Sequence, residues 1–174
     1  CGGMFYYNGP GGGGQKVYNN TTVGTTVIQP ILGQSVTNPI VIKNNIAKSV
    51  SQLATVQQSS FVGTANYDII YDFANILDWN AGNSYATLAA AQAAGFELNG
   101  SDQDPLLTGN YMLTAGSPAV NTGENLTSLG IAALNSDAAG VARPASGAWD
   151  VGAYEFVVGG EASRPRAVLP KRVR

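Results

Sequence analysis

The sequence contains no histidine and a single cysteine, Cys1. Without histidine, a Ser-His-Asp triad or an imidazole acid or base is excluded. One cysteine cannot form an internal disulfide framework or a metal site built from several cysteines. Cys1 could carry a lipid in a processed lipoprotein, or the chain could begin in the middle of a larger protein; we favour the second interpretation.

Charged residues are also scarce, at 11% of the chain, against about 25% in an average soluble protein. Residues 161–174 hold five of the nine basic residues and only one of the eleven acidic ones. The rest of the chain is therefore acidic and lacks the basic surface that nucleic acids require. No apolar run approaches the ~18 residues of a membrane-spanning helix. We expect neither a nucleic-acid partner nor a transmembrane segment.

In place of charges, the chain has many uncharged polar residues beside 44% hydrophobic ones in a total of 174. This length and apolar content suit one domain with a real core. A surface of Asn, Thr, Ser, Gly and Gln is common in secreted and sugar-handling proteins. We predict a domain over residues 1–158, followed by a flexible basic tail over 159–174.

Two short segments with an asparagine pair repeat along the chain, "KVYNNTTV" and "VIKNNIAK". Aligning Asn19 with Asn44, and Asn20 with Asn45, gives a shift of about 25 residues. Short β-branched strands, bounded by turns and repeated at this distance, match one coil of a parallel β-helix. Asparagine tolerates the left-handed backbone of a sharp corner, and its amide can bond to the next coil. The pattern predicts an asparagine ladder, with chance pairs in polar loops as the alternative.

Later segments predict one more strand and one helix. The stretch "FVGTANYDIIYDF" (61–73) alternates enough for a single strand with Tyr67 and Tyr71 on one face. The stretch "NSYATLAAAQAAG" predicts a helical excursion over about 84–95, capped by Asn83 or Ser84. We expect this short flanking helix to need support from the strands.

Eight short motifs occur in an order that resembles a known superfamily: "VYNNTTV", "IVIKNNIA", "ANYDIIY", "LDWNAGNSYATLAAAQAAG", "DQDPLL", "YMLTAGSPAVNTG", "SDAAGVARP" and "WDVGAYEF". The chain is similar to the C-terminal part of right-handed parallel β-helix proteins, the pectin-lyase-like superfamily, and especially to choice-of-anchor Q proteins. The resemblance implies a solenoid fold and a secreted or cell-surface protein. It implies no single activity, because members include polysaccharide lyases and other sugar-active proteins.

The stretch 117–156 is rich in turns and ends in "WDVGAYEF". Arg143 is the only arginine before residue 164, and a guanidinium pairs well with carboxylates. We predict a structural clasp of Asp137, Arg143, Asp150 and Glu155 in a cap that closes the end of the stack. The alternative is a catalytic arginine, because β-helix lyases need a basic group to remove a proton.

Other polar residues give weaker signals. Asp102 and Asp104 could hold calcium with nearby carbonyls, although an aspartate before proline is commonly a turn former. Lys43 and Lys48 read as solvated lysines rather than bases. Three acids lie close together and leave glycoside cleavage open, although we favour solvated turn residues: Asp68, Asp72 and Asp78. We predict no catalytic residue, no metal other than this calcium candidate and no other cofactor.

Four aromatic residues are candidates for stacking on sugar rings: Tyr18, Tyr67, Tyr71 and Trp79. An aromatic face with asparagine or aspartate beside it is what a carbohydrate surface needs. Packing into the core is the alternative for at least half of them.

The sequence thus predicts an all-β right-handed parallel β-helix with one short flanking α-helix and a C-terminal cap. The expected function is that of a non-catalytic C-terminal portion of a secreted or cell-surface protein, which binds glycans or builds an extracellular assembly. The alternative is part of a polysaccharide lyase or glycoside hydrolase whose active coils precede Cys1. Expected partners are a carbohydrate polymer or other copies of the chain, joined through an open N-terminal edge.

Overall fold

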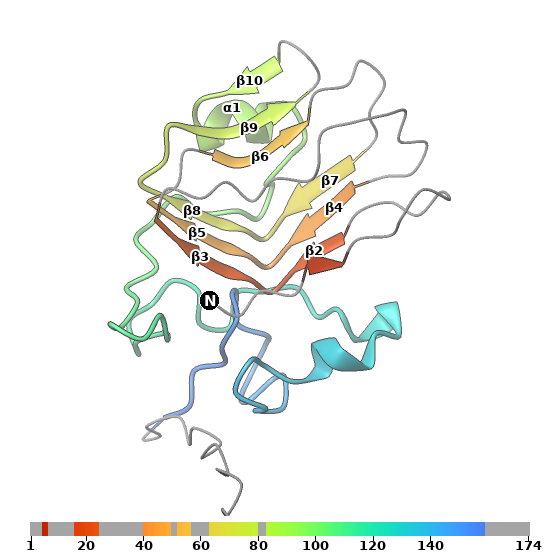
Figure 1. The fold of residues 1–174 in the computed structure, drawn as a ribbon, viewed down its shortest axis with the longest axis vertical. Coiled ribbons are helices and arrows are strands. Elements are labelled where there is room, and N and C mark those ends of the chain that lie inside the picture. Colours follow the sequence, from red (N-terminus) through yellow and green to blue (C-terminus); the bar gives the residue numbers. More distant parts are fainter. Residues whose placement is uncertain are drawn as a thin grey trace, which may run out of the picture.

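The structure, a computed structural model, describes residues 5–6, 16–24, 40–49, 52–56, 63–79 and 83–158. This part is mostly β-structure with little helix, and most strand pairs are parallel (Figure 1). The all-β class predicted from the sequence is confirmed at this level. Cys1 and the predicted tail, 159–174, lie outside the described residues.

The strands form three sheets. The first has the order β1-β2-β4-β7, with β1 Phe5–Tyr6, β2 Lys16–Tyr18, β4 Ile40–Lys43 and β7 Gly63–Asn66. The second has the order β3-β5-β8, with β3 Thr21–Val23, β5 Ile46–Lys48 and β8 Ile69–Tyr71. The third has the order β10-β9-β6, with β6 Gln52–Val56, β9 Asn75–Trp79 and β10 Asn83–Tyr85.

The chain visits these sheets in the same order at each of three levels: β2–β3, β4–β6 and β7–β9. Between the first two levels Lys16 lies opposite Val41, and hydrogen bonds join residues 25 apart. Between the second and third levels Ile40 lies opposite Gly63, and the separation is 23. The second sheet follows the same two steps. The repeat seen in the sequence is therefore a real register of parallel strands.

A sharp corner joins the first sheet to the second at each level. Asn19, Asn44 and Tyr67 occupy it with φ of 52°, 58° and 62°. Asparagine enters this left-handed region more readily than other non-glycine residues, which explains the first two corners. The third corner corrects the expectation of one strand over 61–73, because the chain turns at Tyr67 and divides that stretch into β7 and β8.

The inner core lies between the sheets and is built from stacked rows. Val17, Ile42 and Ala65 are register partners in the first sheet, and all three are buried in one cluster. Ala47 and Ile70 form the matching row of the second sheet. Alternate residues of a strand face opposite sides, so each short strand contributes one or two residues to this core.

Helix α1, Leu88–Ala93, packs against the same core through the fully buried Ala91. The helix is shorter than the predicted 84–95, and Thr87 caps it by accepting the Ala90 N–H. Asn83 and Ser84, the expected caps, instead belong to β10, which pairs antiparallel with β9.

Residues 96–101, which we call the closing segment, continue from α1 across the edges of β7 and β8. Glu97 N donates to Ala65 O at 2.7 Å, and Ile70 N donates to Ser101 O at 2.9 Å. These bonds occupy main-chain groups at the third level of strands.

Residues 104–158, the C-terminal segment, cover the outer faces of the first two sheets, away from the third sheet (Figure 1). One outer cluster joins Ile46 and Ile69 to Val151. A second joins Tyr18 to Trp149. This placement corrects the expectation of a cap across the end of the stack, because the outward-facing residues Tyr18, Ile46 and Ile69 of β2, β5 and β8 are apolar enough to need a cover.

Strand β1 pairs antiparallel with β2, with Phe5 opposite Val17. The expected open edge is therefore paired at β2, because another strand of the same chain takes up its hydrogen-bonding groups. None of the helices in the described part of the chain has the length and apolar character that a membrane crossing requires.

Candidate functional site

A buried ladder of polar side chains runs through the corners between the first two sheets. Asn20 Nδ2 donates to Asn45 Oδ1 at 3.0 Å, and Asn45 Nδ2 donates to Asp68 Oδ1 at 2.8 Å. The same oxygens accept the main-chain N–H groups of Asn20 and Asn45, at 3.0 and 2.6 Å. Each side chain thus satisfies the backbone of the preceding level, which a buried corner requires.

The other two predicted ladder residues, Asn19 and Asn44, shape the corners and lie outside this chain of contacts. The Asn44 side chain exchanges two hydrogen bonds with the main chain of Glu124, both at 2.8 Å. Gly152 N also donates to Asn44 O at 2.8 Å. Asn44 is therefore one of the points where the C-terminal segment is fixed to the strands.

The third level carries an acid where the first two carry asparagine. Asp68 is fully buried, and so is Glu97 from the closing segment. Burial raises the pKa of Asp68 to about 6. Burial, followed by the charge of Asp68, raises the pKa of Glu97 well above its ordinary value. This pair of buried acids has no counterpart at the other two corners.

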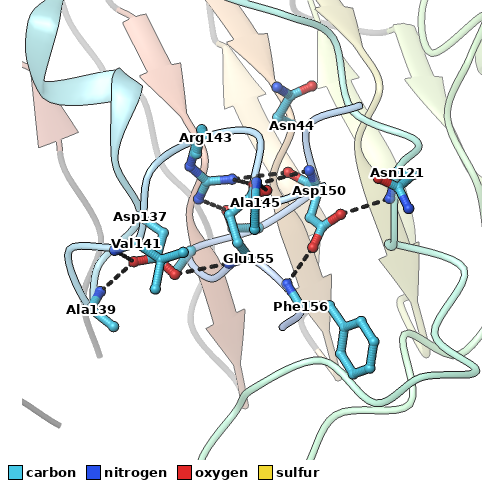
Figure 2. A network of polar contacts seen from close by, with 12 residues as sticks. Asn44, Asn121, Asp137, Ala139, Val141, Arg143, Ala145, Asp150, Glu155 and Phe156 are labelled. Atoms are coloured by element: carbon cyan, nitrogen blue, oxygen red, sulfur yellow. Dashed lines mark hydrogen bonds and ion pairs between the residues drawn. The ribbon is translucent and has the colours of Figure 1, made fainter. Parts of the chain in front are cut away.

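The predicted clasp residues meet inside the C-terminal segment (Figure 2). Arg143 donates through one terminal nitrogen to Glu155 Oε1 at 2.6 Å and to Asp150 O at 3.1 Å. Its other terminal nitrogen donates to Gly152 O at 2.8 Å. The guanidinium also lies 5.7 Å from the ring centre of Trp149. Arg143 therefore binds one carboxylate and two main-chain carbonyls of the last turn of the segment, residues 150–155.

The three acids of this network bind main-chain N–H groups. They accept from residues spread along the segment: Asn121, Ala139, Val141, Ala145, Asp150, Glu155 and Phe156. Such bonds replace the ladders that a segment with so little regular structure lacks. The carboxylates are thereby occupied, which is the geometry of a structural clasp (Figure 2).

The main-chain donors and Arg143 offset part of the effect of burial on the pKa values of two clasp acids. Burial raises the pKa of Asp150 and of Glu155, while main-chain donors and Arg143 act in the opposite direction. Burial also lowers the pKa of Arg143, and the surrounding acids oppose that effect. One guanidinium faces three carboxylates, so the site depends on its main-chain donors to hold the excess negative charge.

The four predicted sugar-stacking residues do not share one surface. Tyr18 is buried against Leu126 and Trp149, so its ring has no open face; this corrects its assignment as a binding residue. Tyr67 and Tyr71 are partly exposed. The Trp79 side chain lies outside the described residues.

The calcium candidates serve a turn and an ion pair. Asp104 Oδ1 lies 2.6 Å from Lys48 Nζ and accepts the Leu106 N–H at 3.0 Å, and the hydrogen bond from Lys48 lowers the pKa of Asp104. Asp102 is exposed. Lys43 is paired in the same way, at 2.7 Å from Glu124 Oε2. Nowhere in the described part of the chain do three histidine, cysteine, aspartate or glutamate side chains gather as a metal site requires.

Of the other two acids of the glycosidase alternative, Asp72 does not join Asp68. Asp72 is exposed and accepts from Ser49 Oγ at 2.8 Å. The Asp78 side chain lies outside the described residues. Asp68 and Asp72 thus occupy a buried corner and an exposed one.

A small pocket of about 50 Å³ lies beside the clasp, lined in part by Leu113, Asp137 and Phe156. This volume suits a water molecule or two. Ligand pockets are commonly several hundred Å³, so a sugar ring needs more space than this hollow has.

Sequence reasoning missed the partners Glu97 and Glu124. It also read Asp68 as a solvated turn residue. The signal for Asp68 was present, because it follows Asn45 by 23 residues, but the step differed from the first one and tyrosine-aspartate replaced the asparagine pair.

Comparison with known proteins supplies no relative. No protein-family model, no curated protein and no solved structure matches this chain. The geometry described above is therefore the basis on which a function is proposed.

Proposed function

We propose that this chain is part of a right-handed parallel β-helix protein, secreted or at the cell surface, which binds a polysaccharide without cleaving it. The observation that carries the proposal is the parallel register of two sheets over three levels and of a third sheet over two levels. Strands that return to the same sheet after 25 and then 23 residues are what stacked coils require. The order of motifs shared with pectin-lyase-like proteins supports the same fold.

Binding without cleavage is supported by the way the charged groups are used. Arg143 is buried in the clasp, and Lys43 and Lys48 are each paired with an acid. A lyase base must be free to take a proton from its substrate. Among the described residues, these three cations are engaged in the fold, and the fourth, Lys16, is exposed at the start of β2.

A candidate binding surface lies at the last residues of the strands of the second sheet, beyond the part of its outer face that the C-terminal segment covers. Val23, Lys48 and Tyr71 are neighbours in register along this sheet. Lys48 Nζ lies 5.2 Å from the ring centre of Tyr71, and Ser49 and Asp72 follow at the adjacent corners. An aromatic ring with hydroxyl and carboxylate neighbours is suited to a sugar, which stacks its apolar face and bonds its hydroxyls.

The test is affinity electrophoresis in gels that contain pectin, alginate or related polymers, together with an assay for released uronates. We expect retardation without release, and about 2- to 10-fold weaker retention for Tyr71→Ala. Tyr111→Ala is the matched control, because Tyr111 is exposed but belongs to the C-terminal segment and not to the second sheet.

Three outcomes would contradict the proposal. Release of uronates would favour the lyase or hydrolase alternative. Equal losses in both tyrosine variants would move binding away from the second sheet. Absence of retardation, with concentration-dependent association in sedimentation, would favour an assembly of copies of the chain.

A further inference from the structure

The buried acids Asp68 and Glu97 lie where the closing segment meets the strands. Around them, Glu97 N donates to Ala65 O at 2.7 Å, and Ser101 N donates to Asp68 O at 3.0 Å. Ile70 N completes the contact by donating to Ser101 O. The two carboxyl groups therefore sit at the junction that these backbone bonds form.

The hydrogen bonds to the two carboxyl groups leave one oxygen of each without a donor. Asp68 Oδ1 accepts from the main-chain nitrogen and the side-chain nitrogen of Asn45, at 2.6 and 2.8 Å. Glu97 Oε2 accepts from Asp68 N at 3.2 Å. Asp68 Oδ2 and Glu97 Oε1 are buried and accept no N–H from the described residues. Such orphaned oxygens are costly in a dry site.

The two side chains lie within hydrogen-bonding reach of each other. Two ionised carboxylates have only lone pairs to offer, so a bond between them needs one proton. Space around the pair is also limited, because a Cβ on Gly100 would lie 2.7 Å from Glu97 Oε2. A single proton between the two groups is enough to supply that bond.

Neighbouring charges do not neutralise the pair. Lys43 is the cation that acts on Asp68, and its Nζ is already 2.7 Å from Glu124 Oε2. Gln92 Nε2, from α1, donates to the main-chain oxygen of Glu97 rather than to its carboxyl group. In the described part of the chain, no ion pair involves either acid.

We propose that Asp68 and Glu97 share one proton in the folded protein, and that this proton fastens the closing segment to the third corner of the strands. Glu97 carries the proton, because the two donors from Asn45 stabilise the charge on Asp68. Removal of the proton places two carboxylates side by side without water. The closing segment then loosens and uncovers the backbone groups of β7 and β8.

The direction of the pH dependence follows from the raised pKa values. The pKa of Asp68 rises from 3.8 to about 6 on folding, and that of Glu97 rises as well. The folded state therefore binds protons more tightly than the unfolded state. The stabilisation is fully present at acidic pH and is lost as the pH rises from about 4 through 6 and beyond.

Two isosteric substitutions test the proposal in the full chain. In Glu97→Gln and in Asp68→Asn an amide N–H takes the place of the shared proton, and Asn at position 68 also continues the ladder. We expect both variants to unfold at higher urea concentration than the wild type at pH 8, with an unfolding constant lowered roughly tenfold or more. We also expect them to flatten the fall in stability between pH 5 and pH 8.

Asp137→Asn is the matched control. Both Asp137 oxygens accept main-chain N–H groups. An asparagine side chain there would therefore place its own N–H group against a main-chain N–H group. This variant should be less stable than the wild type at both pH values. The contrast separates a site that needs a proton from one that needs a carboxylate.

Amide hydrogen exchange provides the local measurement. At pH 8 the amides of Glu97, Ser101 and Ile70 should exchange faster in the wild type than in Glu97→Gln, while that of Val151 should match. Loss of stability in Glu97→Gln at every pH would overturn the proposal. A second result would also overturn it: calcium or sodium ions raise the urea midpoint of the wild type at pH 8 but leave that of Glu97→Gln unchanged. A cation, and not a proton, would then occupy the site.

Discussion

Glu155 is the carboxylate that pairs with Arg143 in the C-terminal segment. Its Oε1 accepts from Arg143 and from Asp150 N, and its Oε2 accepts from Ala145 N at 2.8 Å. Both ends of the Arg143–Glu155 pair have side chains that are only 1% exposed. Removing one partner of a buried pair leaves an uncompensated charge without water around it.

We therefore expect Glu155→Gln to lower the free energy of unfolding by about 3 kcal/mol, because Gln offers a donor where the fold needs acceptors and leaves Arg143 without its anion. Urea denaturation would measure the change. The matched control is Glu124→Gln, which breaks the half-exposed pair with Lys43 and should cost about 1 kcal/mol or less. Equal losses of unfolding free energy in the two variants would show that the buried Arg143–Glu155 pair stabilises the fold no more than the partly exposed Lys43–Glu124 pair.

At the scale of elements, the sequence predicted those corners of the chain that are set by the local preference of a residue for a left-handed backbone. The asparagine pairs at 19–20 and 44–45 identified two corners, because asparagine suits a left-handed backbone and its amide bonds across levels. The third corner was missed because the left-handed conformation of Tyr67 contradicts the usual preference of tyrosine. The second level of strands on one side and the closing segment on the other impose it. Tertiary context here overrode a local signal.

The placement of the C-terminal segment was beyond the reach of sequence patterns. Its apolar residues, such as Leu126, Leu134 and Trp149, have no regular period, and the segment contains only two short 3-10 helices, Thr127–Leu129 and Ala132–Asn135. Periodicity tells which face of an element is apolar, but irregular chain gives no such face. The clasp residues were predictable as a group, because Arg143 is the only arginine before residue 164 and a guanidinium pairs well with carboxylates. The two carbonyls that Arg143 binds and the main-chain donors to the acids were not predictable.

Gly152 is where this segment comes closest to the strands. Its φ is +101°, and a Cβ there would lie 2.7 Å from both Ile46 Cδ1 and Thr21 Oγ1. We expect Gly152→Ala to lower the free energy of unfolding by roughly 2–4 kcal/mol, through backbone strain and overpacking together. Urea denaturation and the rate of proteolysis within 117–156 would report the loss.

Gly130→Ala is the control for backbone strain alone. Gly130 also has a positive φ, +68°, but a Cβ there would meet nothing within 4 Å. We expect Gly130→Ala to lower the free energy of unfolding by about 1 kcal/mol. The difference between the two variants then measures the steric overlap of the added Cβ with the strands at Gly152. If both alanine variants lost the same stability, the close approach at Gly152 would not be what holds the segment in place.

For the whole molecule, the strands of the first two sheets have buried residues on both faces. The inner cluster contains Ile42 and Ile70, whereas the outer clusters use Tyr18, Ile46 and Ile69 from the same sheets. Short strands of three or four residues bury too little on one face to be stable alone. The C-terminal segment therefore completes the fold that the levels of strands begin.

This arrangement predicts that the strands and the C-terminal segment unfold together. The chain has two tryptophans, and Trp149 is 1% exposed within the outer cluster with Tyr18. In a Trp79→Phe variant, Trp149 fluorescence reports only on the segment, while far-UV circular dichroism reports on the strands. We expect the two urea midpoints to coincide, as in a two-state transition. A fluorescence change at lower urea than the change in circular dichroism would mean that the segment leaves first, and that the strands bury enough apolar surface on their inner face to stand without it.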